Sequence, residues 1–393
     1  MATEAEAAAR TALVGARVFD GNRIRNGTSV LIDGDRIAAV VSDGDVPSDY
    51  QRQDVSGLIA PGFVDIQVNG GGGVMFNDHR TIEGIAAIGT AHRPYGTTGF
   101  LPTLITDTPD VMAEAIAAVQ DALARGVPGL LGVHIEGPFL NPVRKGAHRE
   151  DYIRPITEDD IVAIAADSRG ATMLTLAPEM VPVDAVRRLA DAGVLLAAGH
   201  TKATYDEIQA ARRAGLTAFT HLFNAMPPLT GREPGPVGAA LDDPQAWCSV
   251  IVDLHHVSAP SLRVAIAARG WDRTILVTDA MASVGSPDDA FDLHGRTISR
   301  SGGRLTMADG TLAGSDLDMA TAVRNCVEEL RLPLEAALHM ASQAPAEFLG
   351  LGNELGQVTP GFRASLVLLN DALQVRETWI SGRSSAQIDA VNA

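Results

Sequence analysis

The hydrophobic pattern divides the chain into two β-rich ends and a centre in which strands alternate with helices. Near the N-terminus, Asp33-Gly34 lies between two β-rich runs, residues 29–32 and 36–41. An Asp-Gly pair in this setting predicts a hairpin. The C-terminal end has the same texture, in residues 365–369 and 377–380. We therefore expect the two ends to pair into one small β-sandwich domain.

The centre contains eight apolar strand candidates, and stretches with apolar residues at helical spacing lie between them. Alternation of strands and helices is typical of a parallel sheet, and eight such units can close a barrel. We predict an α/β fold with a (β/α)8 TIM-like barrel, and an open, doubly wound sheet is the alternative. The strand candidates are residues 58–68, 98–105, 130–135, 172–177, 194–198, 218–222, 247–254 and 274–278.

Length and composition agree with this division. The 393 residues, 46% of them hydrophobic, suffice for a barrel at residues 58–354 and a small β domain built from residues 1–57 and 355–393. The formal net charge of -17 argues against nucleic-acid binding, which needs a dense basic surface. A small anionic substrate is still compatible with it, because a local pocket can be positive.

Targeting signals and cysteines indicate a cytoplasmic protein without a membrane segment. The N-terminal residues 1–6 are acidic and lack the basic and apolar regions of a signal peptide, and no apolar stretch approaches the roughly 18 residues of a membrane span. The two cysteines, Cys248 and Cys326, lie in apolar runs. We expect them to be buried free thiols in a reducing compartment.

Polar residues follow the barrel strand candidates. Glu136, His200, His221 and Asp279 each come at or just after the end of one of them. In a barrel these ends lie on one face, where the βα loops surround a common pocket. One carboxylate and two imidazoles can bind a divalent metal and leave a position open for water. A single histidine is more often structural, but the shared placement favours a metal site at Glu136, His200 and His221.

Three further residues have both a functional and a structural interpretation. Asp279 could be a helix N-cap, or a general base beside a metal. His148 could be a solvated loop residue, although its loop starts near Glu136 and must pass over the site. Arg232, in a proline-rich loop, could pair with the neighbouring Glu233 or bind a phosphate or carboxylate with its planar guanidinium.

Six segments of the barrel form a recognisable set. They are His134-Ile-Glu-Gly-Pro-Phe-Leu-Asn, Lys145-Gly-Ala-His, Gly199-His-Thr, Thr220-His-Leu-Phe-Asn-Ala-Met, Val277-Thr-Asp-Ala and Leu312-Ala-Gly-Ser. These segments resemble the family of N-acetylglucosamine-6-phosphate deacetylases, a branch of the amidohydrolase superfamily. The resemblance spans nearly the whole barrel and implies hydrolysis of the acetamide of N-acetyl-D-glucosamine 6-phosphate to D-glucosamine 6-phosphate and acetate.

The resemblance also implies a role for each site residue. Glu136, His200 and His221 would hold one divalent metal. Asp279 would be the catalytic base and then the acid, and His148 would contact the acetyl carbonyl. The phosphate would bind Arg232 and His256 at a site completed across a homodimer interface. The sugar site would be lined by Ala147, Asn224, Ala225, Leu312, Ala313 and Gly314.

Two departures from related sequences bear on this interpretation. Many amidohydrolases have a His-x-His pair after the first strand, but this chain has Gln67-Val-Asn69. Amides bind divalent ions weakly, so we predict a single metal ion, zinc. The family usually has glycine where this chain has Leu254, and a branched side chain there could alter the backbone beside His256.

Two other classes of function are considered. The same scaffold could host another hydrolase, such as an N-acyl-amino-acid deacylase or a cyclic-amide hydrolase, because one fold supports many reactions. A catalytically silent barrel that acts as a binding partner is the second alternative. A phosphate requirement would distinguish the first alternative, and the metal content would distinguish the second.

Overall fold

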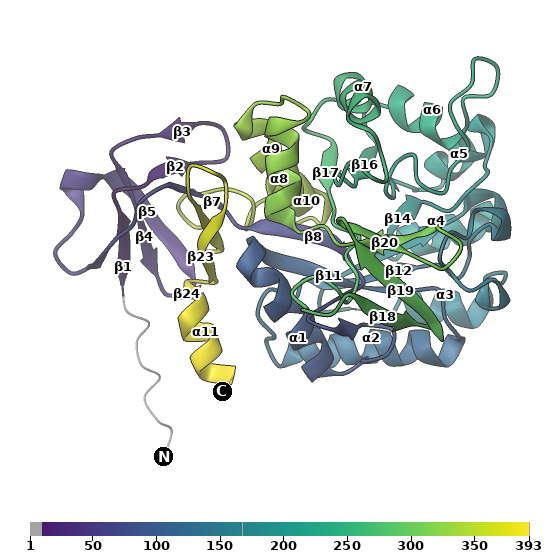
Figure 1. Ribbon diagram of the computed structural model, residues 1–393, viewed down its shortest axis with the longest axis horizontal. Helices are drawn as coiled ribbons and strands as arrows, with labels where there is room; N and C mark the ends of the chain where they lie inside the picture. Colours follow the sequence, from purple (N-terminus) through teal and green to yellow (C-terminus); the bar gives the residue numbers. More distant parts are fainter. Residues whose placement is uncertain (1–9, 167, 393) are drawn as a thin grey trace.

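The structure is a computed structural model that describes residues 10–166 and 168–392, in two parts (Figure 1). A small, mainly β part lies beside a larger α/β part, and both ends of the described chain lie in the small one. The acidic residues 1–6, on which the cytoplasmic prediction partly rests, lie outside the described residues. The domain boundaries at 57/58 and 354/355 stay a prediction.

The small part is a sandwich of two sheets, in the orders β5-β4-β1-β6 and β24-β23-β22-β7-β2-β3. The predicted hairpin is confirmed, because β4 (Thr28–Asp33) pairs with β5 (Arg36–Ser42) antiparallel. The second sheet joins both ends of the chain, since β22 (Leu366–Leu369) pairs with β7 (Leu58–Pro61). The other strands are β1 (Thr11–Val14), β2 (Arg17–Phe19), β3 (Ile24–Arg25), β6 (Gln51–Asp54), β23 (Val375–Ile380) and β24 (Arg383–Ser384).

The large part is built on a parallel sheet of eight strands that neighbour one another in chain order, which confirms the barrel and excludes the doubly wound alternative. The predicted first strand, residues 58–68, is wrong as a single element: it divides at Gly62, where a Cβ would lie only 2.0 Å from Thr98 Oγ1. The strands are β8 (Phe63–Val68), β11 (Thr97–Ile105), β12 (Gly132–Glu136), β13 (Ala171–Leu176), β14 (Leu195–Ala198), β15 (Ala218–Phe219), β16 (Trp247–Val250) and β17 (Thr274–Leu276).

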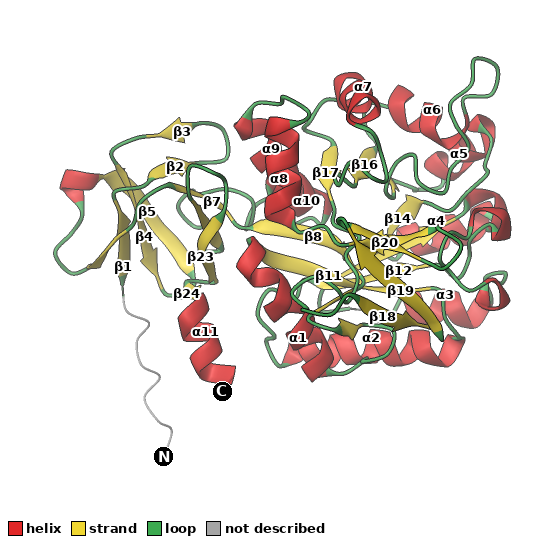
Figure 2. Ribbon diagram, viewed as in Figure 1, coloured by secondary structure: helices red, strands yellow, loops and turns green. Residues whose placement is uncertain are grey.

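Helices α1 to α10 surround this sheet, and α11 lies beside β23 and β24 of the small part (Figure 2). Thr81, Thr108, Thr157 and Thr204 cap four of them by accepting a main-chain N–H of the first turn. No helix in the described residues is long and apolar enough to cross a membrane. The helices are α1 (Ile82–His92), α2 (Pro109–Ala124), α3 (Glu158–Ile164), α4 (Val183–Asp191), α5 (Tyr205–Arg213), α6 (Gly235–Asp242), α7 (Ala259–Arg269), α8 (Met319–Glu328), α9 (Leu334–Ala341), α10 (Gln343–Phe348) and α11 (Ser385–Asn392).

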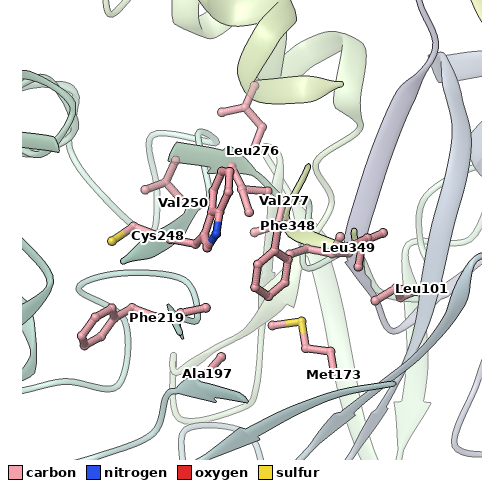
Figure 3. Packing of buried hydrophobic residues seen from close by; sticks show 14 of the residues in the cluster. Leu101, Met173, Ala197, Phe219, Cys248, Val250, Leu276, Val277, Phe348 and Leu349 are labelled. Atoms are coloured by element: carbon pink, nitrogen blue, oxygen red, sulfur yellow. The ribbon is translucent and has the colours of Figure 1, made fainter. Parts of the chain in front are cut away.

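The barrel interior is filled by apolar side chains rather than left open. Figure 3 shows Phe348, at the end of α10, pointing toward Met173 among side chains of the barrel strands. Its ring lies 6.0 Å from that of Trp247, at the start of β16. Both cysteines are buried and unpaired, as predicted. Because apolar side chains fill the interior, a site can form only at an end of the barrel. In this fold it forms at the carboxyl ends of the strands.

An antiparallel sheet that the sequence did not predict is inserted between β17 and α8. We call it the insertion sheet. Its strands have their own small core, which also includes Ile105 and Met281 from the barrel. Mostly exposed and polar strand residues explain why the hydrophobic pattern missed it. The strands are β18 (Ala290–Leu293), β19 (Arg296–Ser301), β20 (Arg304–Thr306) and β21 (Leu312–Ser315). The remaining short elements are β9 (Gly70–Gly71), β10 (Val74–Met75), η1 (Asp43–Asp45), η2 (Arg93–Tyr95), η3 (Pro142–Arg144), η4 (Glu150–Tyr152) and η5 (Pro178–Met180).

The barrel closes where β8 meets the segment after β17, and a buried carboxyl group bridges this seam. Asp65 accepts hydrogen bonds from the Thr278 hydroxyl at 2.5 Å, the Thr278 main-chain N–H at 3.3 Å and the Gln67 N–H at 3.2 Å. One residue further, the Asp279 N–H donates to the Gln67 carbonyl at 3.0 Å. Burial raises the pKa of Asp65 to about 7, although these hydrogen bonds oppose the rise.

The raised pKa of Asp65 predicts a pH-dependent stability. Below about pH 4 the group is protonated in both states, and its contribution to stability is fully present. As the pH rises toward 7, the unfolded chain loses this proton first, so the contribution is lost. The side chain of Asp65→Asn does not ionise. The free energy of unfolding of this variant should therefore rise relative to that of the parent over this pH range, by up to about 4 kcal/mol.

Denaturant unfolding at pH 5 and pH 7.5 would measure this difference. Asp371→Asn is the control, because the Asp371 side chain is 94% exposed. If the Asp65→Asn and parent stabilities change in parallel with pH, the carboxyl group does not titrate as described.

Candidate active site

The predicted metal ligands converge at the carboxyl end of the barrel. Glu136 is the last residue of β12, and His200 and His221 follow β14 and β15. Glu136 Oε1 lies 3.2 Å from His200 Nε2 and 3.0 Å from His221 Nε2, and the two Nε2 atoms are 3.1 Å apart. All three side chains are buried. The structure thus brings together three residues that are up to 85 positions apart in the chain.

This donor set fits a divalent metal ion. A buried carboxylate and two imidazole nitrogens within about 3 Å of one another need a proton or a cation between them, and zinc prefers such nitrogen and oxygen ligands. Burial disfavours the charged form of Glu136, but the adjacent imidazoles of His200 and His221 outweigh this effect and hold the pKa of the carboxyl well below its usual value. Glu136 thus carries a charge that a metal can use.

A second trio is also compatible with a metal, since ligand atoms of Glu136, His148 and His200 lie within 4.8 Å of one another. The hydrogen bonds of the far ring nitrogens distinguish the two histidines. His200 Nδ1 lies 2.8 Å from the Arg144 carbonyl and must donate to it, which leaves the Nε2 lone pair facing Glu136. His148 Nδ1 instead accepts the Thr106 N–H at 3.3 Å, so its proton is on Nε2.

His148 therefore presents an N–H donor to the site rather than a lone pair. Its ring lies 4.4 Å from that of His200, and burial lowers its pKa well below the usual value, so the ring stays neutral. A neutral imidazole with its proton on Nε2 can donate to a carbonyl oxygen. We therefore assign the third ligand position to His221 rather than to His148 on this geometry.

Asp279 lies beside the trio and is held by two amides. Its Oδ1 accepts from Asn69 Nδ2 at 2.7 Å and from Gln67 Nε2 at 3.2 Å, and Gln67 Nε2 also lies 3.2 Å from Glu136 Oε1. Burial, and then the charge of Glu136, raise the pKa of Asp279 to about 6. The N-cap interpretation of Asp279 is wrong, because the next helix in the described chain begins at Met319.

Three of these residues have a left-handed backbone, which is uncommon for residues other than glycine. The φ angles are 49° at His200, 32° at His221 and 53° at Asp279. Hydrogen bonds of the main chain stabilise these conformations. The His221 N–H donates to Ser249 Oγ at 2.7 Å, and the Asp279 carbonyl accepts from the Ser315 N–H at 2.9 Å. Such strain concentrates at functional sites, where surrounding structure fixes the side-chain directions.

A cavity of about 240 Å³ opens over these residues. It is close to the lower end of the roughly 300–1,000 Å³ of small-molecule pockets, which suits one sugar ring rather than a polymer. Seven residues expected from the resemblance line it: Ala147, His148, Asn224, Ala225, His256, Leu312 and Gly314. Five residues that the sequence did not single out as cavity lining also line it: Asn69, Ile105, Gly146, Met281 and Thr311. Ile105 ends β11, so the same strand-end rule could have found it.

Two residues predicted to contact the substrate, Ala313 at the sugar and Arg232 at the phosphate, lie away from the cavity in the single chain. The Ala313 side chain is fully buried in the core of the insertion sheet, since alternate residues of a strand point to opposite faces. Arg232 is exposed on the loop between β15 and α6 and does not line the cavity. Its phosphate-binding role stays a prediction that depends on the dimer.

Leu254 adopts the backbone that glycine would favour, with φ 65°. The segment is held by Asp253, whose Oδ1 accepts the N–H groups of His255 and His256 at 2.9 Å each. His256 Nδ1 lies 2.6 Å from Asp253 Oδ2, so His256 Nε2 is free to face the cavity. The backbone at Leu254 therefore keeps the left-handed conformation that glycine would favour, and the leucine side chain makes this conformation strained.

Comparison with known proteins identifies the family. Residues 58–384 match the amidohydrolase family. The chain belongs to this family. An N-acetylgalactosamine-6-phosphate deacetylase from Shewanella sp. (strain ANA-3) is 42% identical over 327 residues, 83% of each chain. These matches, and the two structures below, confirm the resemblance to the amino-sugar-phosphate deacetylase branch of the superfamily.

Two solved structures share the whole fold. The N-acetylglucosamine-6-phosphate deacetylase from Pasteurella multocida has a TM-score of 0.93 and 33% identity, and the match covers 95% of this chain and 99% of that one. A variant of the corresponding enzyme from Mycobacterium smegmatis, in complex with N-acetyl-D-glucosamine-6-phosphate, has a TM-score of 0.88 and 32% identity, covering 96% and 99%.

The strain at Leu254 can be measured by comparing two substitutions. Leu254→Ala and Leu254→Gly both remove the half-buried side chain, but only glycine relieves a positive φ. We expect the glycine variant to be more stable than the alanine variant by about 1 kcal/mol, the reverse of the order at ordinary positions. Thermal unfolding would measure it, and an alanine variant as stable as the glycine variant would contradict the strain.

The assignment of the third ligand predicts different metal affinities for two histidine variants. His221→Ala should weaken zinc binding by at least 10- to 100-fold, because a ligand is lost. His148→Ala should keep near-parental zinc affinity, because this ring donates from Nε2. Competition with a chelator would measure both affinities, and the opposite order would make His148 the ligand.

Proposed function

We propose that this protein hydrolyses the acetamide of N-acetyl-D-glucosamine 6-phosphate, releasing acetate and D-glucosamine 6-phosphate. The observation that carries the proposal is the placement of Asp279 beside the Glu136, His200 and His221 trio, at the end of a cavity of monosaccharide size. Relatives that act on amino-sugar phosphates at 32–42% identity support the same reaction. The reaction belongs to amino-sugar catabolism.

In this proposal, each step of the reaction is assigned to a residue of the site. A divalent ion held by Glu136, His200 and His221 would polarise the amide carbonyl and make water more acidic. His148 Nε2–H would donate to the acetyl oxygen as negative charge develops there. Asp279 would take a proton from the attacking water and then deliver it to the nitrogen as the C–N bond breaks. The raised pKa of Asp279, about 6, suits both transfers.

Further parts of the proposal concern the setting of the site. We take the ion to be zinc, one per chain, because the donor set is nitrogen and oxygen. The phosphate would bind His256 and Arg232, with Arg232 reaching the neighbouring site in a homodimer. A cytoplasmic location is proposed from the composition and agrees with two unpaired, buried thiols.

N-acetylgalactosamine 6-phosphate is the second candidate substrate. The Shewanella relative at 42% identity is a deacetylase of this sugar phosphate, which differs from the glucosamine compound in the configuration at C4. The cavity wall formed by Thr311, Leu312 and Gly314 is available to contact the ring on either epimer. The choice between the epimers is therefore a measurable part of the proposal.

The test is acetate release from both epimeric sugar phosphates and from unphosphorylated N-acetylglucosamine, before and after chelation. We expect activity on N-acetylglucosamine 6-phosphate that is lost on chelation and restored by zinc, and a much poorer reaction without the phosphate. Asp279→Asn should keep its zinc and lose roughly 10³-fold in turnover, because the base is gone. No acetate from either sugar phosphate by zinc-loaded protein would end the proposal.

A further inference from the structure

The insertion sheet contacts the loop that carries His148, and Arg296 makes the direct contact. Its Nη2 donates to the main-chain carbonyl of Ala147, the residue before His148. Arg296 begins β19, directly after the tight turn at His294 and Gly295, and its guanidinium also lies 3.5 Å from Met307 Sδ. The guanidinium of Arg296 is therefore held in place by the hairpin and does not belong to a freely moving surface side chain.

The Ala147 side chain reinforces this contact. It packs against the apolar core of the insertion sheet, together with Phe291 and Met307. The main chain of Ala147 is thus held by Arg296 while its methyl group is held by the sheet. Both contacts therefore restrain Ala147, which directly precedes His148, the residue that donates into the cavity.

A second contact holds the other side of the His148 ring. Thr106 binds His148 Nδ1 through its N–H at 3.3 Å and its hydroxyl at 2.8 Å. Asp107, the next residue, lies 3.3 Å from His294 Nε2 at the tip of the same hairpin. The hairpin therefore touches both the segment that fixes the His148 ring and the segment that fixes its backbone.

We propose that Arg296 is a positioning residue for His148: by holding the Ala147 carbonyl it sets where the His148 Nε2–H points. This proposal rests on the proposed function for the role of His148. The insertion sheet also supplies Leu312 and Gly314 to the cavity wall, so Arg296 fixes the His148 loop relative to the wall that faces the sugar.

Arg296→Met tests the proposal, because methionine fills similar space without a donor. We expect kcat on N-acetylglucosamine 6-phosphate to fall roughly 10- to 100-fold, the scale of a misplaced catalytic group, with KM nearly unchanged. Zinc content should stay at the parental level. Arg296→Lys, which retains one donor, should recover part of the loss.

Arg300→Met is the matched control. Arg300 lies on the same strand and also donates to main-chain carbonyls, those of Ser283 and Ser286, at 3.0 and 3.1 Å. It does not contact the His148 loop, so we expect kcat within about twofold of the parent. An equal loss of kcat in both variants would indicate general damage to the insertion sheet and would overturn the specific role of Arg296.

A double-mutant cycle separates positioning from structure. In a His148→Ala background, Arg296→Met should cost little further activity, because the residue that it positions is absent. Multiplicative losses in the cycle would overturn the proposal. Should Arg296→Met fail to fold, Arg296→Gln, whose side chain is too short to reach Ala147, takes its place in the same cycle.

Amide hydrogen exchange provides a readout that does not depend on the substrate. Peptides covering residues 141–152 should exchange faster in Arg296→Met than in the parent or in Arg300→Met, while the barrel strands are unchanged. If the parent hydrolysed neither sugar phosphate, the proposed function would fail, and the exchange rates would still decide whether Arg296 holds this loop. Unchanged exchange would overturn its role.

Discussion

The site depends on how the barrel closes between its first and last strands. Asp65 joins the main chain of Gln67 to Thr278, and the carbonyl of Gln67 then accepts the N–H of Asp279. These contacts bring the side chains of Gln67, Asn69 and Asp279 to the same edge. A carboxyl group that is fully buried at the seam is costly unless its acceptors are filled, and three donors fill them here. The contacts that close the fold therefore also place Asp279 beside Gln67 and Asn69.

The side-chain amides of Gln67 and Asn69, at the end of the first barrel strand, hold the two buried carboxylates of the site. Gln67 donates toward both Glu136 and Asp279, and Asn69 donates to Asp279. Two buried carboxylates near each other repel, and the amide N–H groups offset part of that repulsion without adding a charge. Because the amide N–H groups face the carboxylates, Gln67 and Asn69 contact Glu136 and Asp279 as hydrogen-bond donors. The candidate cation site is therefore the cluster of Glu136, His200 and His221, with Asp279 beside it.

Two histidines of the site differ in their chemistry because their far ring nitrogens have different hydrogen-bond partners. His200 and His148 both face Glu136, with ring centroids 4.4 Å apart. A carbonyl behind His200 and an N–H behind His148 place the protons on opposite ring nitrogens. One ring then offers a lone pair and the other a donor. The loop between β12 and α3 supplies both Arg144 and His148, so its conformation decides the division of roles.

Much of this protein could be predicted from local patterns. The eight barrel strands, the pairing of both ends in a small sandwich and the trio at Glu136, His200 and His221 follow from hydrophobic periodicity, and from polar residues where strands end. Only the tertiary structure revealed the insertion sheet, whose polar strands carry little hydrophobic signal. It also revealed the division of the first strand at Gly62, where β7 joins the small part and β8 joins the barrel. The ring proton of His148, the burial of Ala313 in the core of the insertion sheet and the reach of Arg296 to Ala147 were likewise decided in three dimensions. Each depends on an atom far away in the chain, and local sequence carries no information about such a neighbour.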